Sequence, residues 1–192
     1  MNSFSEYARQ YIFRLQEVLG KIKHEEVEEF VNLLFEAREE NRNIFFAGNG
    51  GSAATSSHFA NDFGIGTRQR IKPFRAISLS DNLATITAIG NDFGYDQIFA
   101  RQVEVLGRED DLLVGISASG NSENLVCAFR VAKKLGLTTV AITAFDGGVL
   151  REIADFSVHV PTSKGEYGPA EDAHMILDHL ITNFFVSNLE GR

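Results

Sequence analysis

Residues 44–52 read Ile-Phe-Phe-Ala-Gly-Asn-Gly-Gly-Ser, and this stretch decides the fold. Its apolar start predicts a short buried strand, and the segment after Ser52 has the composition of a helix. A Gly/Ser loop between a strand and a helix exposes backbone N–H groups at the positive end of the helix dipole. The stretch therefore predicts a strand–loop–helix unit whose loop is a seat for an anion, most often a phosphate.

A second loop of the same kind occupies residues 117–122, which read Ser-Ala-Ser-Gly-Asn-Ser. It follows the apolar run at 112–116 and leads into another segment with helical composition. One such loop is weak evidence of phosphate binding. Two in one small chain, both rich in Ser and Asn, are much stronger evidence.

Short apolar segments alternate with helical segments from residue 43 onward. This alternation predicts an α/β fold, with a parallel sheet covered by helices on both faces. Right-handed crossovers would bring the loops at 48–52, 80–82, 117–122 and 144–148 to one edge of the sheet. We expect strands at 43–47, 74–79, 111–117, 138–143 and 156–160, and helices at 52–64, 82–90, 95–106, 122–135, 147–154 and 170–189.

Two amphipathic helices precede this region, at residues 4–20 and 24–41. The second has an apolar stripe that includes Phe30, Leu34 and Ala37, with acidic residues over the rest of its surface. At 192 residues the chain is predicted to be one domain, with N-terminal helices at 1–41 and an α/β core at 43–192.

The composition narrows the class of protein. The 44% apolar and 23% charged content is typical of a globular protein, and no apolar run approaches the roughly 20 residues of a membrane span. The net charge of −8 argues against general nucleic-acid binding, which depends on basic residues. A single cysteine, Cys127, excludes an intrachain disulfide framework, and the N-terminus lacks a secretory pattern. We therefore expect a cytoplasmic protein that binds neither nucleic acid nor membrane.

A nucleotide is the main alternative ligand for the first loop. Gly48, Gly50 and Ala53 loosely match the dinucleotide-binding fingerprint. However, the acidic ribose partner is missing at the end of the second strand, where Asp81 comes only after two serines and a leucine. A Walker-type loop is excluded because the chain has no Gly-Lys-Ser/Thr. Asn49 and Ser52 also suit a phosphate site lined by hydroxyl groups better than the tight glycine turn that binds the pyrophosphate of a dinucleotide.

Histidines and carboxylates recur at helical spacing in two segments. His58 and Asp62 are four residues apart in the helix after the first loop, so they share a face. Glu171 and His179 are eight residues apart in the last helix, a little more than two turns. These four side chains are donors that zinc or a similar divalent ion prefers.

Other polar residues have structural interpretations. His24 and His159 are interpreted as surface or hydrogen-bonded histidines, and the orientation of His174 stays open. Asn91 and Asp92 favour a helix stop, with Asp92 as the cap of the next helix. The alternative for this pair is a polar contact with a sugar hydroxyl.

Four motifs occur in the order Gly48–Ala54, His58–Ala60, Ala88–Gly94 and Gly115–Ser122. Together they resemble the phosphoheptose isomerases, also called sedoheptulose 7-phosphate isomerases, of the sugar isomerase (SIS) domain superfamily. The resemblance extends from the N-terminal helices to the last helix. It implies a three-layer sandwich of five parallel strands flanked by helices. It also implies a homotetramer with active sites at subunit interfaces, in which the apolar faces of residues 4–37 pack between subunits.

The resemblance assigns substrate contacts to both loops and holds the phosphate on the serines of the second. It also favours a substrate contact for Asn91 and Asp92 over a cap alone. Two positions depart from the family: Ala118 replaces a hydroxyl residue, and Gly168 stands where an aspartate is expected. The positions implied to bind substrate are Asn49, Gly50, Gly51, Ser52, Asn91, Asp92, Ser117, Ala118, Ser119, Ser122 and Glu171.

The resemblance also implies an aldose–ketose isomerisation that supplies heptose for lipopolysaccharide or capsule. Moving a carbonyl between C1 and C2 needs a base for a carbon-bound proton, and the enediol(ate) intermediate needs its negative charge stabilised. His179 matches the acid–base histidine of the family. The family's glutamate is Asp62 here, one methylene shorter, and its glutamine is Glu171. Either carboxylate is a candidate for the carbon base.

Zinc is associated with some family members at positions matching His58, Asp62, Glu171 and His179. A carboxylate at 171 binds such a cation better than an amide does. Zinc is therefore a candidate cofactor, and no nucleotide cofactor is expected. The alternative function is a non-catalytic SIS module that binds a sugar phosphate or a protein partner such as a replication initiator. A nicotinamide-dependent oxidoreductase is a more distant alternative.

Overall fold

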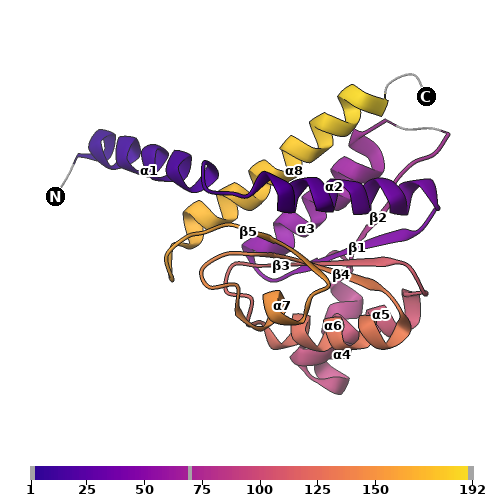
Figure 1. The fold of residues 1–192 in the computed structure, drawn as a ribbon. Coiled ribbons are helices and arrows are strands. Elements are labelled where there is room, and N and C mark those ends of the chain that lie inside the picture. Colours follow the sequence, from indigo (N-terminus) through magenta and orange to yellow (C-terminus); the bar gives the residue numbers. More distant parts are fainter. Residues whose placement is uncertain (1–2, 69–70, 190–192) are drawn as a thin grey trace.

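Five parallel strands form the central sheet of the computed structural model, which describes residues 3–68 and 71–189 (Figure 1). Their order across the sheet is β2-β1-β3-β4-β5, and every pairing is parallel. The predicted parallel sheet is therefore confirmed. The strands are β1 (Asn43–Gly48), β2 (Arg75–Ser78), β3 (Leu112–Ser117), β4 (Thr138–Thr143) and β5 (Phe156–His159).

Helices cover both faces of the sheet, which confirms the three-layer fold. α2, α3 and α8 lie over one face, α4 to α7 lie over the other, and α1 projects away from the sheet (Figure 1). Among the described residues, no helix is both long and apolar enough to cross a membrane. The helices are α1 (Phe4–Leu19), α2 (His24–Glu39), α3 (Gly51–Asn61), α4 (Leu83–Phe93), α5 (Ala100–Leu106), α6 (Glu123–Leu135), α7 (Gly148–Ile153) and α8 (Tyr167–Leu189).

Each face of the sheet has its own apolar core, because neighbouring side chains of a strand point to opposite faces. Phe46 of β1 stacks on Phe59 of α3, with ring centroids 5.1 Å apart, and Phe59 stacks on Phe63 at 5.8 Å. Phe45, the preceding residue of β1, belongs to the opposite core together with Phe129 of α6. Burial on both sides explains why the central strands β1 and β3 are almost wholly apolar.

The chain runs in opposite directions across the sheet on the two sides of β1 and β3, and the candidate site lies at this point. The chain leaves β1 through α3 to reach β2 on one side, whereas β3 lies on the other side of β1. In an open parallel sheet, ligands bind beyond the carboxyl ends of the strands at such a switch point. Gly48 pairs with Ile116 in the strand register, so the loops after β1 and β3 begin side by side. The two predicted phosphate loops therefore meet there.

Several helices differ from their predicted bounds. The helix expected at 52–64 ends at Asn61 and continues as a π-helix, η1 (Asp62–Gly66). The helix expected at 82–90 runs to Phe93, and the one expected at 95–106 is a short 3-10 turn, η2 (Tyr95–Gln97), followed by α5.

The apolar stripe of α2 is buried within the chain, so it is not among the exposed apolar faces of residues 4–37 that are expected to pack between subunits. Phe30, Leu34 and Ala37 are all buried in the core cluster below the helix. The reason is that α2 lies on the sheet, whereas α1 does not.

Candidate functional site

The loop after β1 turns through glycines at the start of α3. Gly50 has a φ of +55°, a left-handed conformation that favours glycine. A Cβ on Gly48 would lie 2.4 Å from the carbonyl oxygen of Ser52, so only glycine allows the chain to pass this close to itself. α3 begins at Gly51, with the N–H groups of its first turn at the positive end of the helix. This is the geometry that an anion seat requires.

The loop after β3 brings serine hydroxyls to the start of α6. The Ser117 Oγ accepts a hydrogen bond from the Gly120 N–H at 3.1 Å and lies 3.4 Å from the Ser122 Oγ. The Ser119 Oγ accepts from the Asn121 N–H at 3.3 Å. Ala118, an expected substrate contact, is only 5% exposed and belongs to the core cluster. The structure therefore gives the side chain of Ala118 a packing role.

A reciprocal amide pair ties the two loops together. Asn49 Nδ2 donates to Asn124 Oδ1 at 3.0 Å, and Asn124 Nδ2 donates to Asn49 Oδ1 at 2.9 Å. The Tyr95 hydroxyl donates to the same Asn49 oxygen at 2.9 Å. A cavity of about 360 Å³ opens here, lined by these three side chains together with Asp96, Ser122 and Glu123.

Asn124 and Tyr95 were missed by the sequence analysis. Asn124 is 3% exposed, and its signal in the sequence is an amide in the first turn of an otherwise apolar helix face, two residues after Ser122.

Asn91 and Asp92 lie in the last turn of α4, and both are exposed. Asn91 Nδ2 donates to Asp92 Oδ1 at 2.8 Å. The residue that precedes the next helical turn is Gly94, not Asp92. The expectation that Asp92 caps the next helix is therefore wrong, because α4 continues three residues further than predicted.

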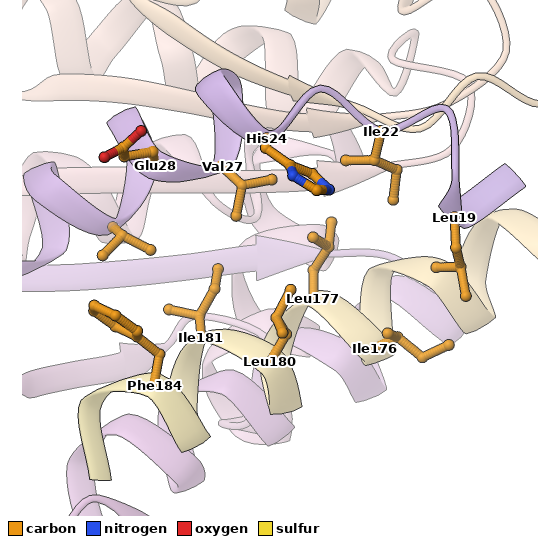
Figure 2. A pocket seen from close by; sticks show the side chains of 11 residues that line it. Leu19, Ile22, His24, Val27, Glu28, Ile176, Leu177, Leu180, Ile181 and Phe184 are labelled. Carbon is orange, nitrogen blue, oxygen red and sulfur yellow. The ribbon is translucent and has the colours of Figure 1, made fainter. Parts of the chain in front are cut away.

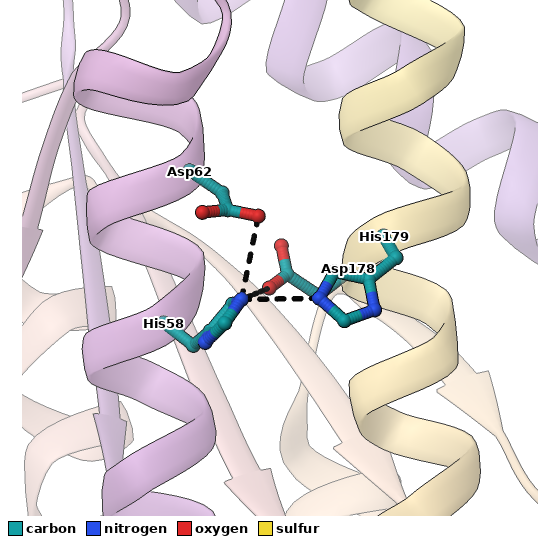
Figure 3. Close-up of side chains that lie close together, drawn as sticks. All are labelled: His58, Asp62, Asp178 and His179. Carbon is teal, nitrogen blue, oxygen red and sulfur yellow. Dashed lines mark hydrogen bonds and ion pairs between the residues drawn. The ribbon is translucent and has the colours of Figure 1, made fainter.

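Two histidines and two aspartates from different helices face one another (Figure 3). We call them the His/Asp cluster: His58 of α3, Asp62 at the start of η1, and Asp178 and His179 of α8. One ligand atom from each lies within 4.8 Å of the others. The Nε2 atoms of His58 and His179 are 3.1 Å apart, and His58 Nε2 is 3.4 Å from Asp62 Oδ2. The structure thus brings together three of the four predicted metal-binding residues.

Asp178 is the cluster member that the sequence analysis missed. Its side chain is fully buried, its Oδ1 accepts from the Thr182 hydroxyl at 3.4 Å, and its Oδ2 lies 3.7 Å from His58 Nε2. Among the described residues this Oδ2 has no hydrogen-bond partner. Burial, and then the charge of Asp62, raise the pKa of Asp178 to about 7.

Glu171 lies over the first loop and not in the His/Asp cluster. A Cβ placed on Gly51 would be 2.2 Å from Glu171 Oε2, so the carboxylate rests against the first residue of α3. The positive end of a helix dipole stabilises a carboxylate in this position. Of the four predicted metal-binding residues, Glu171 therefore lies at the loop after β1, whereas His58, Asp62 and His179 form the cluster with Asp178.

A larger cavity of about 650 Å³ lies elsewhere, between α2 and α8 (Figure 2). Figure 2 shows Leu180 and Phe184 of α8 and Val27 of α2 lining it. His24 and Glu28 are its only ionisable lining residues among the described part of the chain. None of the residues that line it is a predicted site residue.

Comparison with known proteins gives a consistent result. The model of the SIS domain family matches residues 6–144. A phosphoheptose isomerase from Clostridium acetobutylicum is 38% identical over 167 residues, which are 87% of this chain and 84% of that protein. The structure of a phosphoheptose isomerase from Neisseria gonorrhoeae superposes with a TM-score of 0.85 at 31% identity, over 96% of this chain and 100% of that one. One from Francisella tularensis gives 0.86 at 27% identity, over 98% and 100%.

Proposed function

The chain belongs to the phosphoheptose isomerase family of SIS-domain proteins, and from its site we propose that it interconverts sedoheptulose 7-phosphate and D-glycero-D-manno-heptose 7-phosphate. One observation carries this proposal. Two loops with the geometry of an anion seat meet at the switch point of the sheet, and the helix that starts at the first of them carries His58 of the His/Asp cluster. The loops suit a phosphate, and the cluster suits acid–base chemistry. The product would supply heptose for a surface polysaccharide, from a protein that works in the cytoplasm.

The phosphate is assigned to the second loop. Ser117, Ser119 and Ser122 offer hydroxyls at the N-terminus of α6, where the helix dipole favours negative charge. The net charge of −8 gives no general attraction for an anion, so these local groups have to hold it.

The chemistry follows from the residue types. A carboxylate removes the proton from C1 of the ketose, the electron pair moves to form the enediol(ate), and a proton is returned at C2 to give the aldose. His179 moves the proton between the oxygens on C1 and C2. Asp62, in the His/Asp cluster, and Glu171, at the first loop, are the two candidates for the carbon base.

The His/Asp cluster also has the donor set of a divalent-cation site, and the unpartnered Oδ2 of buried Asp178 fits a positive ligand. A zinc ion held there would supply Lewis acidity toward the carbonyl oxygen. His58, Asp62, Asp178 and His179 are the residues that would hold it. With the ion in place, Asp62 and His179 would act as its ligands, and Glu171 at the first loop would be the carboxylate left to move protons.

The test is turnover of sedoheptulose 7-phosphate in D₂O, followed by NMR. We expect an aldose phosphate to form with deuterium at C2. His179→Ala should lower kcat by about 10²- to 10⁴-fold, the usual contribution of a general acid–base group, whereas the matched His24→Ala should not. Binding of the sugar phosphate without conversion would contradict the proposal and favour a non-catalytic SIS module.

We also propose a homotetramer in which α1 contacts other subunits. Phe4 and Phe13 of α1 are 82% and 63% exposed. The Tyr11 hydroxyl donates to Asp172 Oδ2 at 2.6 Å, which fixes α1 against α8. A monomer by light scattering would contradict this tetramer.

The same contact gives a reason for glycine at residue 168, where the family resemblance leads one to expect an aspartate. A Cβ on Gly168 would lie 2.7 Å from the Tyr11 hydroxyl.

A further inference from the structure

We infer that Asp178, in the place expected for Glu171, completes a divalent-cation site with His58, Asp62 and His179. The inference rests on the proposed function for its choice of site, but its test needs no turnover. The family resemblance gives Glu171 both a metal-binding and a substrate-binding role, and the inference assigns these roles to two different residues. Asp178 holds the cation, and Glu171 stays free at the loop that receives the sugar.

The distances from His58 Nε2 to the other three donors are close to those of a tetrahedral site. Ligand atoms about 2.0–2.1 Å from a tetrahedral zinc ion are about 3.3–3.4 Å from one another. His58 Nε2 lies 3.1 Å from His179 Nε2, 3.4 Å from Asp62 Oδ2 and 3.7 Å from Asp178 Oδ2. These separations bracket the tetrahedral value. All four donor atoms lie within 4.8 Å of one another, so one small cation could be held by all of them.

Burial explains why Asp178 needs a positive partner. A buried carboxylate oxygen that lacks a hydrogen bond is costly, because it has lost water and gained nothing in exchange. Asp178 is fully buried, and its Oδ2 points toward the ring of His58 at a distance too long for a hydrogen bond (Figure 3). Thr182 satisfies only the other oxygen. A cation between the two helices would satisfy the Oδ2.

Formal charge and the position of Glu171 both favour a cation site that contains Asp178 and leaves out Glu171. Two carboxylates and two neutral imidazoles neutralise a divalent cation, whereas a third carboxylate would leave an excess charge in a partly buried site. Glu171 already rests against Gly51 at the positive end of α3. Asp178 and His179 are adjacent, so α8 supplies two donors from one turn.

The experiment is a titration of the EDTA-treated full-length protein with Zn²⁺, by calorimetry, for the wild type, Asp178→Asn and the matched control Glu171→Gln. Both variants exchange a carboxylate for an amide of the same size on the same helix. We expect Asp178→Asn to weaken Zn²⁺ binding by about 100-fold or more, and Glu171→Gln to change it by less than about three-fold. With Co²⁺, the intense visible absorption of a four-coordinate site should persist in Glu171→Gln and disappear in Asp178→Asn.

The inference would be overturned if Asp178→Asn bound Zn²⁺ with wild-type affinity, or if Glu171→Gln lost as much Zn²⁺ affinity as Asp178→Asn. Circular dichroism and thermal unfolding of the metal-free variants establish that both are folded. A failure of the proposed function would give a different result from a failure of this inference. If the protein shows the expected Zn²⁺ binding but converts no sugar phosphate, the cation site is supported and the isomerase function is contradicted.

Discussion

His174 should make the protein less stable in mild acid, and replacing it should remove that loss. The side chain lies on α8 with no exposed surface, and among the described residues neither ring nitrogen has a hydrogen-bond partner. Burial lowers the pKa of His174 to about 4, and the backbone of Thr143 opposes this only in part. The imidazole is therefore neutral in the folded protein under conditions that protonate it in the unfolded chain.

The sign and size of the effect follow from linkage. A histidine has a pKa of about 6.5 in the unfolded chain, so between pH 6.5 and 4 the unfolded state binds more protons than the folded state. Stability from His174 is fully present above pH 6.5 and is lost as the pH falls toward 4. With a folded-state pKa of about 4, the loss between pH 7.5 and 4.5 is about 2.5 kcal/mol at 1.36 kcal/mol per pKa unit.

Urea unfolding at pH 7.5 and 4.5, at one protein concentration, measures this loss in the wild type and in His174→Leu. Other titrating groups, including the carboxylates, are common to both proteins and cancel in the difference. The free energy of unfolding of the wild type relative to the variant should fall by about 2.5 kcal/mol from the higher to the lower pH. His174→Gln packs differently but also removes the ring, so it should give the same pH-dependent change. If the wild type and the variant differ in free energy of unfolding by the same amount at both pH values, the reasoning is refuted.

Two further substitutions test close contacts. Gly51→Ala places a Cβ 2.2 Å from Glu171 Oε2, the flexible end of a side chain, so we expect less than about 1 kcal/mol of destabilisation but a higher KM for the sugar phosphate. In the Glu171→Ala background the same change should raise KM no further, and an undiminished effect would contradict the contact. Gly115→Ala places a Cβ 2.5 Å from a ring carbon of Phe129 in the middle of the core, and should destabilise the protein by about 1–3 kcal/mol in urea unfolding. Adding Phe129→Leu to the Gly115→Ala protein should recover part of that loss. If the destabilisation of the double variant equals the sum of the two single ones, overpacking is not the cause.

The sheet was predictable from the sequence because its signals are local. The central strands β1 and β3 are almost wholly apolar, since both faces of the sheet are buried there, and each of the two Gly/Ser loops directly follows one of them. The end of α3 was less predictable. Residues 52–64 keep a helical composition throughout, and composition does not reveal that the hydrogen bonds shift to a π pattern at Asp62, where the Thr67 N–H donates to the Asp62 carbonyl at 2.9 Å.

Asp178 was beyond reach of the sequence for a different reason. α8 buries residues along most of its length, so a carboxylate at 178 has the same appearance in the sequence as any polar residue on a solvated helix face. Only packing against α3 shows that it faces His58 and Asp62.

The short side chain at residue 62 and the buried carboxylate at 178 belong to one arrangement. Asp62 lacks the reach of the glutamate that the family resemblance leads one to expect, yet its Oδ2 comes within 3.4 Å of His58 Nε2. The opposite helix supplies the second carboxylate, so the cluster draws its negative charge from two short side chains on two helices. Such side chains lose less rotamer entropy on ordering than one long side chain would. Since Asp178 is sealed from solvent, it is poorly placed to carry protons to and from a sugar. In the proposed site that work falls to residues at the open side, with Glu171 beside the loop that receives the substrate.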